Sequence, residues 1–466
     1  MLSDRSILPR YTAAAVILLA GCQATSPVPN AQQAASQRSG PAASSSPIQH
    51  VVIVIQENRS FNNFFATYPG ADGTTTGAVV ANSTCGISAS GQIALSESPL
   101  VVKHDLNHSF QAYNTARDGG KMNAFDNILN ADDVPECLAP YQYVKPSDIQ
   151  PYWDMAEQYV LAEHMFSTQG SSSFTGHQDL IRGGTIVAPG QAMVDLPSCS
   201  GGTCRWGCDA PKGTHTSLIT QGDVVEAGKG PFPCTSDFTS KYLTLRDLLD
   251  AKKVSWKYYV PTPCCNTNGK LFAAYDVEYT VRYGPEWGTN VTWPQTNIFT
   301  DISSGELPAV SWLIPVEPDS DHPGEPVDDG PSWVASVVNA IGESSYWNSS
   351  AIVVVWDDWG GLYDNLNPKQ VGYGGLGERV PALIISPYAR AGFISPTYYQ
   401  FGSILKYVED NWNLGSLGTS DAKSKSIINC FDYSQTPITF KPIASERSKE
   451  YFLHRKGHFG PPDTDM

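Results

Sequence analysis

Positively charged residues are scarce in this chain. Its 466 residues include 30 Lys and Arg against 46 Asp and Glu, so the formal net charge is −16 and the sequence pI is near 4.9. A protein that binds nucleic acid neutralises phosphates with a basic surface. The charge balance therefore argues against a nucleic-acid partner.

The apolar run near the N-terminus is short. It covers Ala13 to Leu19, too few residues to cross a bilayer as an ordinary helix, and it follows the basic Arg5 and Arg10. A basic start followed by a short apolar core is typical of an export signal.

The next residues match a lipoprotein cleavage pattern. Leu19-Ala20-Gly21-Cys22 predicts that residues 1–22 are a signal peptide and that Cys22 becomes the lipidated N-terminus of the mature chain. The alternative is a plain signal peptide that is cut later, in the Ala-rich stretch. The pattern implies a bacterial, exported protein that is lipid-anchored at the cell envelope. Gln23 in place of Asp favours the outer membrane over the inner one.

Large apolar residues are nearly absent from residues 23–47. Ser, Ala, Gln and Pro dominate this segment, so it cannot build a core and is expected to be a flexible tether. No second linker of this composition follows. We therefore expect one domain over residues 48–436 and a polar C-terminal extension over residues 437–466.

Cys-x-x-Cys pairs are missing, although the chain has ten cysteines. Their absence disfavours a zinc cluster at Cys199 to Cys208, which stays an alternative, and an exported location favours disulfides. Cysteines crowd an insertion at about residues 195–270, where Cys208 and Cys234 are one candidate pair. Nine cysteines remain once Cys22 is set aside, so one is left over and the connectivity stays open.

Two wholly apolar stretches each end in polar side chains. Val51 to Ile55 precedes the pair Glu57-Asn58, and Ala351 to Val355 precedes the pair Asp357-Asp358. Runs that are apolar on both faces are typical of buried parallel strands, and turn residues after such a strand are the ordinary interpretation. If the two strands are parallel neighbours, however, the four side chains meet at one sheet edge as an oxygen-rich site for a hard divalent cation.

Strand and helix patterns alternate along most of the chain. Further strands are expected at residues 254–260, 310–314 and 380–386, and helices at residues 147–161, 243–253, 333–341 and 403–412. Such alternation predicts parallel crossovers. The predicted fold class is therefore α/β, a doubly wound and mostly parallel sheet with helices on both faces and with loop insertions.

The first polar motif resembles that of a known family. Glu57-Asn58-Arg59-Ser60-Phe61 is similar to the N-terminal signature of the bacterial phospholipase C and acid phosphatase A phosphoesterases, which belong to the alkaline-phosphatase-like superfamily. The resemblance extends from about Ile48 to about Trp412. It implies a divalent metal ion, whose identity stays open, bound by Glu57, Asn58, Asp357 and Asp358.

A serine-rich segment between the motifs resembles the family's nucleophile loop, Gly-Pro-(Ser/Thr)-x-Pro-x-(Arg/His). Aligning residues 169–178 on His177 puts Ser173 at the nucleophile position, where the resemblance also implies contact with the metal. Both prolines of the pattern are missing, so Ser171, Ser172 and Thr175 remain alternatives. At a helix N-terminus, exposed backbone amides would favour phosphate beside such a serine.

Two histidine segments also resemble the family's motifs. Asp105-Leu106-Asn107-His108 is similar to an Asp-Pro-x-His segment, and Asp319 to Pro323, which contains His322, is similar to Ser-Glu-His-Pro. Many members have Asp-His after the Gly-Gly turn, where this chain has Asp364-Asn365. His108 or His322 would then protonate the leaving group. Without the resemblance, His322 could equally be an exposed residue of a solvated acidic loop.

The resemblance implies hydrolysis of phosphate esters through a phosphoserine intermediate, of either the phospholipase C or the acid phosphatase type. The lipid anchor and the many aromatic residues favour a phospholipid-like substrate slightly. A non-catalytic lipoprotein that binds a surface through its metal is the alternative, because it would need the acidic cluster but no nucleophile. Replacing Ser173 separates the two hypotheses.

Overall fold

The computed structural model of the chain describes residues 46–198, 206–220, 224–262 and 273–455. Cys22, residues 23–45 of the expected tether and the crowded cysteines at 199, 204, 264 and 265 lie outside these residues. Among the described helices, none is both long and apolar enough to cross a membrane.

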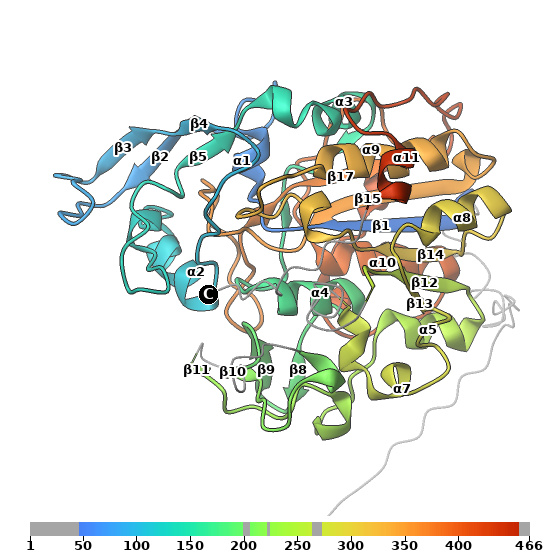
Figure 1. Cartoon of the computed structure of the whole chain (residues 1–466), viewed down its shortest axis with the longest axis horizontal. Helices are drawn as coiled ribbons and strands as arrows, with labels where there is room; N and C mark the ends of the chain where they lie inside the picture. Colours follow the sequence, from blue (N-terminus) through green and yellow to red (C-terminus); the bar gives the residue numbers. More distant parts are fainter. Residues whose placement is uncertain (1–45, 199–205, 221–223, 263–272, 456–466) are drawn as a thin grey trace, which may run out of the picture. The chain divides into compact units, whose positions relative to one another are not determined.

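An eight-stranded sheet forms the centre of the described chain (Figure 1). Its strands are, in spatial order, β13 (Val291–Thr292), β12 (Trp256–Tyr259), β14 (Val310–Leu313), β1 (His50–Gln56), β15 (Ser350–Trp356), β17 (Ala382–Ile385), β6 (Val160–Leu161) and β18 (Phe393–Ile394). The pairs from β13 to β15 are parallel, as is β6 with β18, and only the two pairs that β17 makes are antiparallel. The expected α/β class with a mostly parallel sheet is confirmed.

The direction of β17 differs from the expected parallel crossover. Residues 357–381, which connect it to β15, contain no helix. Parallel neighbours need a long crossover connection, usually a helix, to return the chain to the starting edge. Here the chain loops back at the edge where β15 ends, so β17 pairs with β15 in the antiparallel sense.

Helices cover both faces of this sheet (Figure 1). α3, α9 and α11 pack on one face and α4, α5 and α10 on the other. The described helices are α1 (Phe61–Phe65), α2 (Phe110–Arg117), α3 (Gln150–Gln158), α4 (Ser173–Arg182), α5 (Leu245–Lys252), α7 (Tyr279–Arg282), α8 (Asn297–Ser304), α9 (Gly330–Gly342), α10 (Phe401–Trp412) and α11 (Lys449–His454). The four helices expected from the sequence correspond to α3, α5, α9 and α10.

Smaller sheets extend from the core. A four-stranded antiparallel sheet is formed by the disulfide-containing insertion and the hairpin before it, and three-stranded and two-stranded sheets pair other loop segments. Their strands are β8 (Ile186–Ala188), β9 (Gln191–Val194), β10 (Ser217–Thr220) and β11 (Val225–Glu226); β7 (Met165–Phe166), β16 (Arg379–Val380) and β19 (Tyr399–Gln400); β2 (Thr76–Val79) with β3 (Gly91–Ala94); and β4 (Ser96–Ser98) with β5 (Gln142–Val144).

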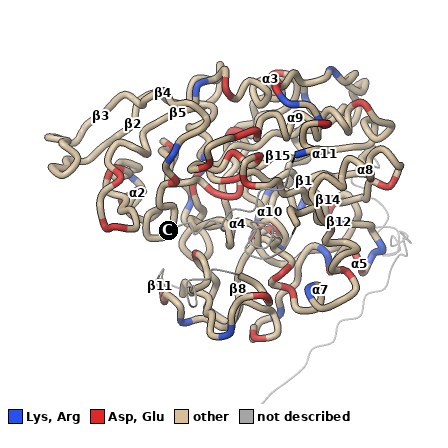
Figure 2. The backbone as a smooth tube through the Cα atoms, in the orientation of Figure 1, with Lys and Arg blue, Asp and Glu red and all other residues tan. Residues whose placement is uncertain are grey.

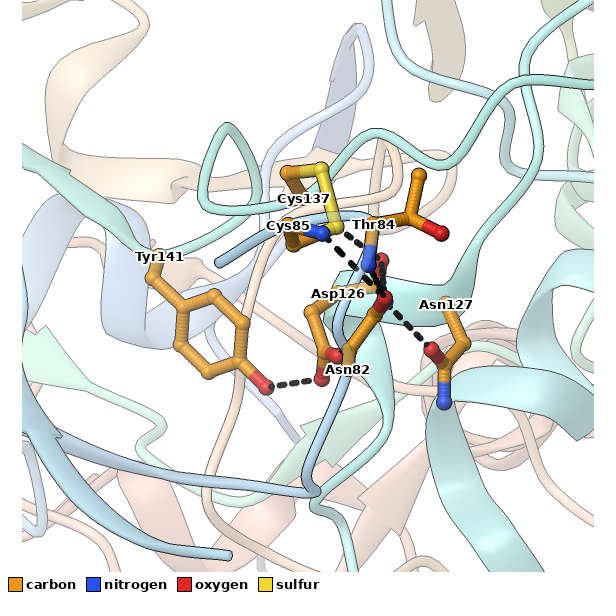
Figure 3. The surroundings of a disulfide bond; sticks show 7 residues. All are labelled: Asn82, Thr84, Cys85, Asp126, Asn127, Cys137 and Tyr141. Carbon is orange, nitrogen blue, oxygen red and sulfur yellow. Dashed lines mark hydrogen bonds between the residues drawn. A yellow bond between two sulfur atoms is a disulfide. The ribbon is translucent and has the colours of Figure 1, made fainter. Parts of the chain in front are cut away.

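Two disulfides lie in the described residues. Cys208 and Cys234 are bonded within the insertion, so the alternative that places Cys208 in a zinc cluster is wrong. Cys85 and Cys137 join the β2–β3 hairpin to the segment before β5 (Figure 3). Asn82 supports this bond, because its Oδ1 accepts from the backbone N–H of Cys85 at 3.3 Å while its amide donates to Asn127 Oδ1 at 2.7 Å (Figure 3). Cys430 is buried and free.

Residues 437–455, the described part of the expected C-terminal extension, pack on the domain. In α11, Phe452 is buried, and its ring centroid lies 5.3 Å from that of Trp333 on α9. Arg455 pairs with Asp319 and, at 3.3 Å, with Asp329. This helix could not be predicted from the sequence of Lys449–His454, because one buried aromatic residue in six defines no periodicity.

Candidate active site

The two polar motifs leave the sheet side by side. β1 and β15 are parallel neighbours with Gln56 opposite Trp356, so Glu57 and Asp357 follow at the same edge. The sequence predicted that the two polar motifs would meet if their strands were parallel neighbours, and the structure shows that they are. Figure 2 shows acidic residues gathered at this end of the sheet, and ligands commonly bind at such edges of α/β folds.

Glu57, His177 and Asp357 form a buried group that could hold a metal ion. One ligand atom from each lies within 4.8 Å of the others. Nε2 of His177 lies 3.0 Å from Oε1 of Glu57 and 3.7 Å from Oδ2 of Asp357. Two carboxylates in a dry site repel each other unless a cation or a proton lies between them. Two oxygen donors and one imidazole suit Zn²⁺ or Mn²⁺ among the divalent ions, so these residues fit the implied metal.

Helix α4 brings His177 to this group. Gly176 packs against β15 so closely that a Cβ there would lie 2.7 Å from the backbone oxygen of Asp357. Only glycine allows this approach, and the approach brings the neighbouring imidazole to the end of the sheet. In the sequence, His177 serves only as the position on which the serine loop aligns with the family's pattern. The histidine offered by the family's loop pattern was the signal that could have identified it as a ligand.

Ser173 is the first residue of α4, and its side chain faces both motifs. Its Oγ lies 3.2 Å from Oδ1 of Asn58 and 3.3 Å from Oδ2 of Asp358, so its single proton can be donated to either oxygen. The alternative residues have other roles. Ser171 Oγ bonds Asp195, Thr175 Oγ1 donates to the backbone oxygen of Ser172, and Ser172 precedes the helix.

Asn58 connects the serine to both histidines. Its Nδ2 lies 3.2 Å from Nε2 of His108 and 3.0 Å from Nε2 of His322. Nδ1 of His108 faces the backbone oxygen of Leu106 at 2.6 Å, and Nδ1 of His322 faces that of Pro323 at 2.5 Å. A nitrogen that faces a carbonyl carries the proton, so in each neutral ring Nε2 has the lone pair and accepts from the amide.

The backbone at Asn58 is held in an unusual conformation. Its φ is +53°, in the left-handed region that asparagine tolerates better than most residues. Gly360, in the turn after Asp358, passes so close that a Cβ would lie 2.2 Å from the backbone oxygen of Asn58. Oδ1 of Asp358 also accepts from the backbone N–H of Gly360 at 2.8 Å. The glycine turn therefore fixes Asn58 and Asp358 relative to each other.

His322 lies in a buried loop, not in a solvated one. The preceding Asp321 accepts through Oδ2 from Tyr152 at 2.6 Å, from Trp356 at 3.1 Å and from Gln56 at 3.2 Å. Burial nevertheless raises the pKa of Asp321 to about 6. These bonds attach the loop after β14 to the ends of β1 and β15, and His322 follows directly.

Asp364, at the position of the family's Asp-His pair, has a structural role. Its carboxylate pairs with Arg379 at 3.1 Å and accepts from the backbone N–H of Asn62. Asn365 accepts from the same guanidinium. The residue that replaces the family's histidine thus accepts from the arginine of a buried ion pair in the loop after β15.

Comparison with known proteins identifies the family. The model of the Phosphoesterase family matches residues 48–415. Phospholipase C A of Mycobacterium tuberculosis is 22% identical, over 85% of this chain and 80% of its own, and phospholipase C B of the same organism is 24% identical over the same shares. Non-specific phospholipase C3 of Arabidopsis thaliana is 22% identical, over 87% of this chain and 77% of its own.

Solved structures are more distant. A protein in the alkaline phosphatase superfamily from Vibrio parahaemolyticus is 11% identical with a TM-score of 0.34, over 83% of this chain and 73% of that chain. The phosphonate monoester hydrolase of Silicibacter pomeroyi is also 11% identical, with a TM-score of 0.28, over 63% and 73%.

The family match and the relatives named phospholipase C indicate a phosphoric ester hydrolase, here with an α/β fold and a buried serine beside a metal-type donor set. The chain belongs to the Phosphoesterase family, as the sequence motifs indicated.

Proposed function

We propose that the protein hydrolyses phosphate esters through a phosphoserine formed at Ser173. Glu57, His177 and Asp357 would hold a divalent ion, with the oxygens of Asn58, Asp358 and Ser173 beside it. When bound, the ion would neutralise phosphoryl oxygens and favour the ionised form of the serine. The observation that supports the proposal is the pair of short distances from Ser173 Oγ to Asn58 and Asp358.

Asp358 is the group that would take the serine proton. Its Oδ2 lies 3.3 Å from Ser173 Oγ and 3.7 Å from Nε2 of His108. As Oγ attacks phosphorus, the O–H bond breaks, the proton moves to Oδ2 and the ester P–O bond on the opposite side breaks. Water then cleaves the phosphoserine, returning the proton to Oγ and releasing phosphate or a phosphate monoester.

The departing alcohol requires a proton of its own. His322 is the better candidate to supply it, because His108 lies on the Asp358 side of Asn58, next to the group that accepts the serine proton. A protonated imidazole at Nε2 would donate to the leaving oxygen and be reprotonated from solvent. For this, Nε2 of His322 must exchange the bond that it accepts from the Asn58 amide in the neutral ring for a bond that it donates to the leaving oxygen.

The substrate class has two candidates. The relatives named phospholipase C support a phospholipid-like diester, which would leave a diglyceride alcohol and a phosphorylated head group. The acid phosphatase type would instead act on monoesters and release inorganic phosphate. The two substrate classes differ in one respect: in a diester a second phosphoryl oxygen is esterified with an alcohol, and in a monoester it is not.

The test compares p-nitrophenyl phosphate with p-nitrophenyl phosphorylcholine between pH 4 and 8, for the wild type and for Ser173→Ala. Turnover that Ser173→Ala abolishes supports the phosphoserine route, and the preferred substrate assigns the type. Rapid quenching with a ³²P-labelled substrate should trap acid-stable label on the wild type alone. Turnover that survives in Ser173→Ala would refute the route, and bound metal without turnover of either ester would favour the surface-binding protein.

We also propose that the mature protein is anchored by lipid at Cys22 and resides at the cell envelope, in the outer membrane. The support is the Leu19-Ala20-Gly21-Cys22 pattern followed by Gln23. Labelling of cells with radioactive palmitate should mark the wild type and spare Cys22→Ser. Label on both proteins, or on neither, would contradict lipidation at this cysteine.

A further inference from the structure

A second cavity lies behind the helix that carries the serine. It has a volume of about 440 Å³ and lies between the C-terminal half of α4, the loop before that helix and the loops at residues 369–376 and 418–425. None of the residues assigned to the catalytic centre lines it. From His177 to Asp179, which lines the cavity, the helix turns by about 200°, so the cavity and the candidate metal ligands lie on opposite faces of α4.

Three residues in the wall of this cavity carry buried polar atoms without partners. Within the described chain, Oγ1 of Thr168, Oδ1 of Asp179 and Oγ of Ser420 have no hydrogen-bond partner, and all three residues are in its wall. Asp179 is fully buried, and its other carboxylate oxygen accepts from Gln169. An unsatisfied buried polar group costs about 1–3 kcal/mol. All three atoms are covered in the described structure, so a ligand would reach them only after their side chains turn toward the cavity. A ligand with hydroxyl groups could then satisfy all three, because a hydroxyl both donates and accepts.

Three exposed lysines line the same cavity. They are Lys369, Lys423 and Lys425, and none of them forms an ion pair with a carboxylate in the part of the chain that the structure describes. The ammonium of Lys369 lies 4.0 Å from the centre of the Tyr398 ring. Three unneutralised cations at one opening are unusual in a chain of net charge −16, and they suit an anionic group on the ligand.

We propose that this cavity binds a phosphorylated polyol. Its hydroxyls would bond Thr168, Asp179 and Ser420, and its phosphate would lie among the three lysines. Its carbon atoms would pack on the apolar part of the wall, which includes Tyr399 and Leu376. The inference does not depend on which ester the catalytic centre cleaves, because it concerns binding on the other face of α4.

The test measures binding by calorimetry with the metal-loaded protein. The probe is 3,4-dihydroxybutylphosphonate, whose carbon–phosphorus bond a phosphoesterase does not cleave. Butylphosphonate, without hydroxyls, and 1,2-butanediol, without the anion, are the matched ligands. The proposal requires clearly weaker binding of both. Equal binding of butylphosphonate would mean an amphiphile site and would overturn the polyol assignment.

Two sets of variants locate the binding. Replacing both Lys423 and Lys425 by Ala should weaken it roughly 2- to 30-fold, as expected for two exposed ion pairs, and should leave p-nitrophenyl phosphate turnover unchanged. The matched control replaces Lys241 and Lys252, which are exposed but outside the cavity. Binding that the cavity variant does not alter, or a probe that only competes with substrate, would overturn the proposal.

The wall is tested without removing any existing bond. Thr168→Val and Ser420→Ala delete hydroxyls that bond nothing in the described structure, so folding should not suffer. Each should nevertheless weaken the probe roughly 2- to 10-fold, the value of one hydrogen bond. Unchanged affinity in both would show that the ligand does not reach this wall.

Discussion

Ser173 and Asn58, 115 residues apart in the chain, are joined by a hydrogen bond of 3.2 Å from Oγ to Oδ1. The serine begins α4 and the asparagine follows β1, so the bond connects the candidate nucleophile to the central strand of the sheet. The amide of the same asparagine faces His322, 264 residues further along the chain. One small side chain thus contacts both the candidate nucleophile and the candidate proton donor, which come from different elements.

The first prediction concerns the nucleophile. Ser173→Ala should lower kcat for p-nitrophenyl phosphate by at least ~10³-fold, because it removes the hydroxyl that faces Asn58 and Asp358. Its metal content, measured by plasma mass spectrometry, should stay within about twofold of wild type, because the three candidate ligands are untouched.

Ser172→Ala is the matched control for that change. The neighbouring hydroxyl has no hydrogen-bond partner in the described structure, and its loss should change kcat by less than ~10-fold. If Ser172→Ala were the inactive variant and Ser173→Ala the active one, the alignment of the serine loop would be off by one residue.

The second prediction concerns His177, which the sequence analysis left without a role. His177→Ala removes the one nitrogen donor of the Glu57, His177 and Asp357 group. The loss of a direct ligand should weaken metal binding by more than the ~10–100-fold that loss of a supporting residue costs. The midpoint of activity against free metal concentration measures this, and an unchanged midpoint would exclude His177 as a ligand.

Some residues of this site could be predicted from the sequence and others could not. The difference is whether a residue is positioned by the strand next to it in the chain or by packing between distant elements. Glu57 and Asp357 were predictable, because they follow apolar strands and their position is local to those strands. His177 was not predictable from the local pattern of the chain, where only the family's loop motif pointed to it, because its approach to them requires α4 to pack against β15 through Gly176. A packing contact between distant elements leaves no periodic signal in the sequence.

The same distinction applies to the fold. The buried strands were predictable from apolar runs. The antiparallel direction of β17 was not, because it depends on residues 357–381, whose sequence shows only the composition of an ordinary loop. The buried loop around His322 was equally ambiguous, since its many aspartates suggest solvent. Burial is possible there because Tyr152, Trp356 and Arg59 all donate to Asp321.

The third prediction separates the two histidines by the leaving group. A residue that protonates the departing alcohol matters little for p-nitrophenolate, which leaves without help, and much for an alkyl alcohol. His322→Ala should therefore lower kcat/KM by ~10²–10⁴ on an alkyl phosphate ester but far less on the p-nitrophenyl ester. His108→Ala should lower both alike. Equal losses for His322→Ala would contradict its role as the acid.

The fourth prediction concerns the contact that positions α4. Glycine to alanine in a helix ordinarily stabilises by about 0.5–1 kcal/mol. At Gly176 the new methyl group would meet the Asp357 backbone at 2.7 Å, so we expect a net loss of about 1–3 kcal/mol and weaker metal binding. Chemical denaturation and metal titration measure both effects. Gly91→Ala, where a Cβ would meet nothing within 4 Å, is the control and should not destabilise.

The fifth prediction concerns pH and a carboxyl group that is not a candidate metal ligand. Burial raises the pKa of Glu409, on α10, to about 7, and the nearby Asp421 adds to the shift. Between about pH 4.5, where this group ionises in the unfolded chain, and pH 7, the unfolded state therefore holds fewer protons than the folded one. Stability should fall as pH rises through this window.

Glu409→Gln isolates that effect. The variant keeps an oxygen for the backbone N–H of Leu417, which Glu409 Oε1 accepts from at 3.0 Å, but it cannot ionise. The free energy of unfolding of the variant minus that of wild type should increase by at most about 1.4 kcal/mol per pH unit from pH 4.5 to 7. Above pH 7 this gap should stay constant. Urea denaturation across this range measures the gap, with Asp410→Asn, which removes an exposed carboxylate, as the control. Parallel curves for wild type and Glu409→Gln would show that the folded protein accommodates the Glu409 charge without cost.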